Sequence, residues 1–101
     1  MEQQLQKTII DYLRLKKCVV VKFRSVGIKK ENGSYIPMPN LEKGVSDLIA
    51  CMPDGRYLAV EIKQKGNHAT PDQQSFIERI KKNNGIALVA FNLEDVMKII
   101  K

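Results

Sequence analysis

Apolar residues recur at helical spacing in the first segment of the chain. Leu5, Ile9 and Leu13 lie four residues apart, and Ile10 widens the stripe that they form. An apolar stripe with this period is typical of an amphipathic helix that packs one face against a core. The pattern therefore predicts a helix over residues 2–16.

Two further helices are predicted from their boundary residues. Thr70-Pro71-Asp72-Gln73 supplies an N-cap residue, a proline in the first turn and a glutamine at the capping-box position. This second helix is predicted to run to about Lys82, because Asn83-Asn84-Gly85 stops it. Asn92 is predicted to cap an extra C-terminal helix over about 93–100.

Four apolar runs of strand length lie between the helices, at residues 18–24, 47–52, 57–63 and 86–91. The first run is rich in β-branched residues, and the last is apolar throughout, as in a buried strand. Pro53-Asp54-Gly55 is a tight-turn signal, so the middle two runs should pair antiparallel. The unit from 57 to 91 should be a right-handed parallel crossover. These elements predict one α/β domain over residues 1–101, with a small mixed sheet flanked by helices.

A long polar connection, residues 25–46, separates the first strand from the others. Asn32-Gly33 is expected to turn a small hairpin between residues 26–28 and 35–36. Connections of this length within a small chain are usually functional or mobile, so the segment is a candidate for a functional role.

The charge balance narrows the class of partner. A formal net charge of +6 and a pI near 9.4 favour a polyanion, most simply nucleic acid, although a solvated lysine surface gives the same balance. The N-terminus has no apolar signal core, and no run approaches membrane-spanning length. We therefore expect a cytoplasmic chain that does not enter a membrane.

The two cysteines argue against a metal site built on sulfur. Cys18 and Cys51 each lie in an apolar run, which predicts buried reduced thiols, with a disulfide between neighbouring strands as the open alternative. His68 is the single histidine, and the cysteines are not clustered, so a zinc site is not expected.

Two carboxylates and a lysine fall at the ends of the middle strands. Side chains alternate along a strand, so Glu61 and Lys63 share one face while Ile62 turns toward the core. Asp47 opens the preceding strand, and the hairpin brings it near Glu61. A solvated Glu/Lys pair is the ordinary alternative for these residues, but their position at a strand end beside a core favours a site.

This residue set suits metal-assisted hydrolysis of phosphodiesters. Mg²⁺ takes carboxylate, carbonyl and water oxygens, so Asp47, Glu61 and the backbone carbonyl of Ile62 are candidate ligands for Mg²⁺ or Mn²⁺. Lys63 is then placed to position the attacking water or to neutralise charge on the phosphate. Cys18 and Cys51 lack a partnered base and are not candidate nucleophiles.

Two polar residues head apolar helical stripes and are weaker candidates. Gln73 precedes Phe76 and Ile77 on one face, so it should aim at the end of strand 57–63; a purely local capping role is equally compatible. Glu2 heads the first helix in the same way, with helix-dipole placement as its alternative.

Basic side chains of two loops flank the expected site. They are candidates for contact with nucleic-acid phosphates, and each has a solvated loop charge as its alternative. The set is Lys29, Lys30, Lys43, Lys65 and His68.

Four sequence blocks, taken in order, resemble the VRR-NUC (virus-type replication-repair nuclease) branch of the PD-(D/E)XK nuclease superfamily. They are an early Glu2, Gly44-Val45-Ser46-Asp47-Leu48, Val60-Glu61-Ile62-Lys63 and Thr70-Pro71-Asp72-Gln73-Gln74-Ser75-Phe76. The resemblance implies a restriction-endonuclease-like αβββαβ core. It also implies metal binding by Asp47 and Glu61, assistance to the attacking water by Lys63, and completion of the site by Gln73. Glu2 is a further candidate metal ligand, but this role carries over less securely, because alignments of helix ends are loose.

The resemblance also sets expectations for activity and partners. Stand-alone members look like Holliday-junction resolvases, which implies a homodimeric, metal-dependent DNA endonuclease selective for branched DNA. The segment 25–46 is a candidate dimer interface. The resemblance is also compatible with a virus-encoded protein that acts inside a host cell. The alternatives are a non-catalytic nucleic-acid-binding module that keeps the nuclease fold, and a small interaction protein whose basic surface is incidental.

Overall fold

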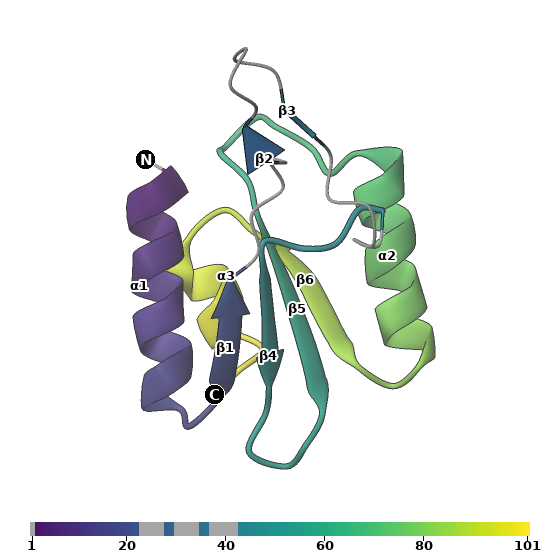
Figure 1. Cartoon of the computed structure of the whole chain (residues 1–101). Coiled ribbons are helices and arrows are strands. Elements are labelled where there is room, and N and C mark those ends of the chain that lie inside the picture. The colour runs from purple at the N-terminus through teal and green to yellow at the C-terminus, as the bar shows by residue number, and fades with distance from the viewer. Residues whose placement is uncertain (1, 23–27, 30–34, 37–42) are drawn as a thin grey trace.

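The computed structural model describes residues 2–22, 28–29, 35–36 and 43–101 (Figure 1). The helices are α1 (Glu2–Leu15), α2 (Pro71–Lys82) and α3 (Leu93–Met97). The strands are β1 (Val19–Lys22), β2 (Ile28–Lys29), β3 (Tyr35–Ile36), β4 (Leu48–Cys51), β5 (Tyr57–Ile62) and β6 (Ile86–Ala90).

A mixed four-stranded sheet is the centre of the fold. Its order is β1-β4-β5-β6, with antiparallel pairing at β1/β4 and β4/β5 and parallel pairing at β5/β6. The parallel pair is joined through α2, which is the crossover expected of a strand–helix–strand unit. The short strands β2 and β3 form a separate antiparallel pair. The fold is thus a mixed α/β sheet flanked by helices, as predicted.

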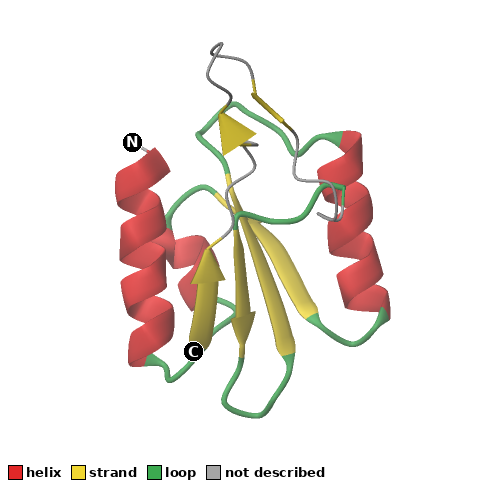
Figure 2. Ribbon diagram, in the orientation of Figure 1, coloured by secondary structure: helices red, strands yellow, loops and turns green. Residues whose placement is uncertain are grey.

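The helices cover the two faces of the sheet unequally (Figure 2). On one face, Ile9 and Leu13 of α1 and Val96 of α3 are fully buried in the larger core, together with Leu58 and Val60 of β5. On the other face, α2 packs a smaller core mainly over β5 and β6, with Ile49 of β4 at its edge. That smaller core consists of Ala59, Phe76, Ile77 and Ala87. Strand β5 is therefore buried on both faces, which encloses any side chain at its end.

Most predicted elements are confirmed, with shorter boundaries. β1 covers Val19–Lys22 rather than residues 18–24, and α3 ends at Met97 rather than at 100. The hairpin predicted on either side of Asn32-Gly33 is present as the β2/β3 pair, although its turn lies outside the described residues. No helix within the described ranges is long and apolar enough to cross a bilayer.

The prediction of a buried thiol is confirmed for Cys18 and wrong for Cys51. Both cysteines are free, but Cys51 is exposed. It lies directly across from Val19, which is 69% exposed, on the same face of β4 as Ile49 at the edge of the smaller core. An apolar run predicts burial only where a helix covers the strand, and here α2 lies mainly over β5 and β6 and leaves Cys51 exposed.

Gly44 brings the start of β4 against the start of α2. Its φ is +74°, and a Cβ built there would lie 2.0 Å from the backbone oxygen of Asp72 and 2.7 Å from the backbone nitrogen of Gln73. Only glycine permits both the left-handed conformation and this approach. The contact fixes the chain three residues before Asp47 relative to the first turn of α2.

We expect Gly44→Ala to destabilise the fold by about 3–5 kcal/mol, through backbone strain plus overpacking against α2. Gly55→Ala is the matched control, because Gly55 also has positive φ (+89°) but has nothing within 4 Å. The control should lose only about 1–2 kcal/mol, from strain alone. Urea unfolding of both variants measures the difference. Equal losses would show that the approach to α2 contributes nothing.

Candidate functional site

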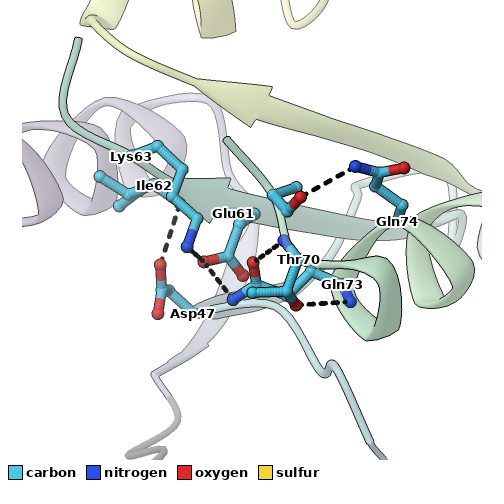
Figure 3. Close-up of polar contacts among 8 residues, drawn as sticks. Asp47, Glu61, Ile62, Lys63, Thr70, Gln73 and Gln74 are labelled. Carbon is cyan, nitrogen blue, oxygen red and sulfur yellow. Dashed lines mark hydrogen bonds and ion pairs between the residues drawn. The ribbon is translucent and has the colours of Figure 1, made fainter. Parts of the chain in front are cut away.

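The site forms where β4 begins and β5 ends. Leu48 pairs with Val60, so the next step of the antiparallel register sets Asp47 across from Glu61. The Asp47 carboxylate accepts a hydrogen bond from the backbone N–H of Ile62 at 2.9 Å (Figure 3). Lys63 is anchored from the other side, because its backbone N–H donates to the carbonyl of Ala90 at 3.1 Å. Bonds from both neighbouring strands therefore hold the end of β5.

One oxygen of Glu61 has two polar partners, a hydrogen-bond donor and an ion-pair partner. Nε2 of Gln73 lies 3.2 Å from Oε2 of Glu61, and Nζ of Lys63 lies 3.8 Å from the same oxygen. The other oxygen, Oε1, is buried without a hydrogen-bond partner among the described residues. Figure 3 shows Asp47 and Lys63 on one side of Glu61 and Gln73 on the other. The four residues predicted from sequence are thus brought together in space.

Gln73 fills both of the roles that the sequence left open. Its Oε1 accepts from the backbone N–H of Thr70 at 2.8 Å, and its backbone N–H donates to Oγ1 of Thr70 at 3.2 Å. This is a complete capping box at the start of α2. Because Oε1 is held by the cap, Nε2 is directed at Glu61. Capping and the site therefore share one side chain, and each constrains the other.

Burial makes Glu61 a proton-binding group at neutral pH. Its side chain is only 3% exposed. Desolvation raises the pKa of Glu61 to about 8, with help from the negative charge of Asp47, while the positive charge of Lys63 opposes the shift. A buried carboxyl with a raised pKa keeps its proton at neutral pH unless a cation replaces that proton. The solvated Glu/Lys pair considered from sequence is therefore wrong for Glu61.

The donors present fit a hard divalent cation. Asp47 and Glu61 give two adjacent carboxyls, and the buried Oε1 of Glu61 has no hydrogen-bond donor among the residues that the structure describes. No third His, Cys, Asp or Glu joins them within the described residues. Mg²⁺ commonly takes only one or two carboxylates and keeps several waters, so this set is sufficient.

An open pocket of about 320 Å³ lies over these groups. Its lining includes two residues that the sequence analysis missed, Gln3 and Gln6 of α1. A signal for Gln6 was present: Ile9, Ile10 and Leu13 follow it at the same offsets at which apolar residues follow Gln73. The full lining is Gln3, Gln6, Asp47, Glu61, Ile62, Lys63 and Gln73.

The remaining predicted residues are placed less closely. Glu2 begins α1, but its side chain lies outside what the structure describes, as do the side chain of Lys29 and the whole of Lys30. Lys43 is exposed just before β4. Lys65 and His68 are exposed on the loop between β5 and α2. None of the described three lines the pocket, so each stays a prediction for an outer contact.

Glu61→Gln should change how stability depends on pH. The folded chain holds a proton on Glu61 more tightly than the unfolded chain does, so the stabilisation is fully present below about pH 4.5 and is lost as pH rises through 8. Within that window the wild type should lose up to about 1.4 kcal/mol per pH unit relative to the variant, which cannot ionise. Chemical unfolding in chelator from pH 4 to 9 measures this. Parallel pH profiles would contradict the burial of an ionisable Glu61.

Gln73→Ala should destabilise the chain by about 2–3 kcal/mol, because it removes the bonds to both Thr70 and Glu61. Gln73→Glu keeps the cap but sets a carboxylate against Glu61, so its loss should grow with pH. Gln74→Ala is the matched control, since Gln74 makes one exposed bond to the carbonyl of Ala69. Thermal unfolding at pH 5 and pH 8 distinguishes them. If Gln74→Ala lost as much stability as Gln73→Ala, the hydrogen bond between Gln73 and Glu61 would contribute nothing to the free energy of unfolding.

Comparison with known proteins confirms the resemblance drawn from sequence. The VRR-NUC domain model matches residues 2–91 of the chain. A solved VRR_NUC domain is 23% identical with a TM-score of 0.69, over 98% of this chain and 92% of that one. A solved VRR_NUC domain protein is 24% identical with a TM-score of 0.63, over 99% and 84%. No curated protein matches the chain at a significant level. The chain belongs to the VRR-NUC domain family and has its nuclease-type fold.

Proposed function

We propose that this protein is a divalent-metal-dependent endonuclease that hydrolyses phosphodiester bonds in DNA. The observation that carries the proposal is the convergence on one open pocket of two carboxyls, an ammonium group and an amide. Binding alone does not require a carboxyl whose side chain is only 3% exposed to face an anionic ligand, because once ionised such a group opposes phosphate binding unless a cation intervenes. Metal-dependent hydrolysis does require such carboxyls, because they bind the cation.

The residues divide the work according to their chemistry. Asp47, Glu61 and the Ile62 carbonyl would hold Mg²⁺ or Mn²⁺, which when bound supplies Lewis-acid polarisation of the scissile phosphate. Lys63 would orient the attacking water and offset the charge that grows on the phosphate. Gln73 would hold Glu61 in position through Oε2 and leave Oε1 free for the cation.

The charge of the chain supports a nucleic-acid substrate. A net charge of +6 attracts a polyanion from any direction, and the basic residues Lys43, Lys65 and His68 are exposed on segments that lead into or out of the site strands. These contacts would be with phosphates, so they would raise affinity without selecting a sequence. Discrimination among DNA substrates must then come from the shape of the DNA.

We further infer a preference for branched DNA, served by a homodimer. A two-fold dimer places two active sites on one assembly, which suits paired cuts across a junction. The candidate interface named from sequence, 25–46, falls mostly outside the described residues. Sedimentation of the chain with and without a four-way junction tests the dimer independently of cleavage.

Asp47→Ala and Lys63→Ala should each lower cleavage of a four-way junction or flap by about a hundredfold or more in Mg²⁺ or Mn²⁺, with binding retained. Asp54→Ala and Lys81→Ala are the matched controls, because Asp54 lies in the turn at the opposite end of the β4/β5 hairpin and Lys81 is exposed near the end of α2. Both controls should cleave like the wild type. Gel assays with junction, flap, duplex and single-stranded DNA, in metal or chelator, measure the rates.

Two other outcomes would contradict the proposal in different ways. Tight DNA binding without cleavage in any metal would favour a binding module that keeps the nuclease fold. Absence of binding at low salt would leave an interaction protein. Metal binding is tested apart from activity: Mg²⁺ or Mn²⁺ should raise the melting temperature of the wild type and should not do so in Asp47→Ala.

A further inference from the structure

The pocket has a second wall that takes no part in the arrangement around Glu61. Gln6 of α1 lines the pocket, with Gln3 one turn before it. Gln6 lies on the core-facing side of α1, since Ile9, Ile10 and Leu13 follow it at offsets of three, four and seven and pack in or against the larger core. Packing of that stripe therefore fixes where the Gln6 side chain emerges.

Gln73 occupies the same position on α2. Phe76, Ile77 and Ile80 follow it at the same three offsets and pack in the smaller core on the other face of the sheet. Both helices begin at the end of the sheet where β5 finishes (Figure 1). Gln73 and Gln6 therefore flank the end of β5 from opposite faces of the sheet. Each is followed on its helix by apolar residues that pack in a core.

The hydrogen-bonding capacity of the two walls differs. The amide of Gln73 is used on both sides, by Thr70 and by Glu61. Across the described part of the chain, neither Gln3 nor Gln6 has a side-chain hydrogen-bond partner. The wall formed by α1 thus carries amide donors that are free to meet a ligand, next to a carboxyl whose Oε1 is also without a partner.

A neutral amide suits this place better than a cation would. The pocket already holds Asp47 and Glu61 against one Lys63, and a second ammonium would pair with a carboxyl. An amide donates to an anionic oxygen without forming such an ion pair. Amide side chains are regular partners of phosphate oxygens in complexes with DNA.

We propose that Gln6, supported by Gln3, binds a non-bridging oxygen of a backbone phosphate and so positions the DNA strand against Glu61 and Lys63. This inference rests on the proposed function and adds a substrate-binding role for α1. The contact is with the backbone alone, so it carries no base preference. Gln6 orients the strand from the face of the sheet opposite Gln73.

Gln6→Ala should weaken DNA binding about threefold to tenfold, which is the effect of losing one neutral hydrogen bond. Gln3→Ala should act in the same direction with a smaller effect, because Gln3 is exposed. Gln4→Ala is the matched control: the same residue type, on the same helix, exposed and outside the pocket lining. Binding to a flap DNA is measured in chelator, so that cleavage does not interfere. Gln6→Glu keeps the side-chain length and should bind more weakly than Gln6→Ala.

A methylphosphonate scan of the strand identifies the contact directly. Replacing a charged oxygen by a methyl group at one phosphate should weaken binding of the wild type, and the added loss at that position should shrink in Gln6→Ala while persisting in Gln4→Ala. Thermal unfolding of each variant verifies that the fold is intact.

The outcomes separate this inference from the function it rests on. Equal binding by wild type, Gln6→Ala and Gln4→Ala, or methylphosphonate losses that add at every position, would overturn the role of Gln6 even if cleavage is normal. Binding without cleavage by the wild type would overturn the nuclease and leave the Gln6 contact supported if the scan identifies it. Absence of DNA binding by the wild type would overturn both.

Discussion

Burial of the Glu61 carboxyl is the constraint on which the rest of the site depends. A carboxyl that loses water must gain a proton, a donor or a cation. Here Oε2 accepts a hydrogen bond from Gln73 and forms an ion pair with Lys63, while Oε1 has no hydrogen-bond partner within the described part of the chain. The fold accepts an unsatisfied buried oxygen, which ordinarily costs about 1–3 kcal/mol. A sequence selected for stability alone would replace this residue, so the unfavourable burial points to a role in binding or chemistry.

The surrounding elements are arranged so that this burial holds. Strand β5 is enclosed by α1 and α3 on one face and by α2 on the other, so its end cannot be solvated freely. Gly44 lets the chain before Asp47 approach the first turn of α2, and Gln73 ties that turn to Glu61. Secondary structure, helix capping and the site therefore use the same few residues, and loss of one affects all three.

Sequence patterns located most of the candidate site because most of its residues have a recognisable local sequence signal. Asp47 and Glu61 stand at the ends of strands joined by a tight turn, and Gln73 stands at a helix start with an N-cap before it. Gln6 also precedes apolar residues at offsets of three, four and seven. The local sequence did not show that this part of α1 would lie beside the end of β5. Cys51 was misjudged for a related reason, because its apolar run gives no information about which half of the sheet stays uncovered.

The sequence by itself determined the order of helices and strands, the antiparallel hairpin, the capping box and the presence of acidic and basic groups at strand ends. These follow from hydrophobic period, turn residues and caps, all of which act over a few positions. Only the tertiary structure decided that Glu61 is desolvated, that Gln73 reaches it and that Gln6 completes the pocket from α1. Those outcomes depend on which helix covers which face of β5, and such coverage arises from contacts between residues far apart in the chain.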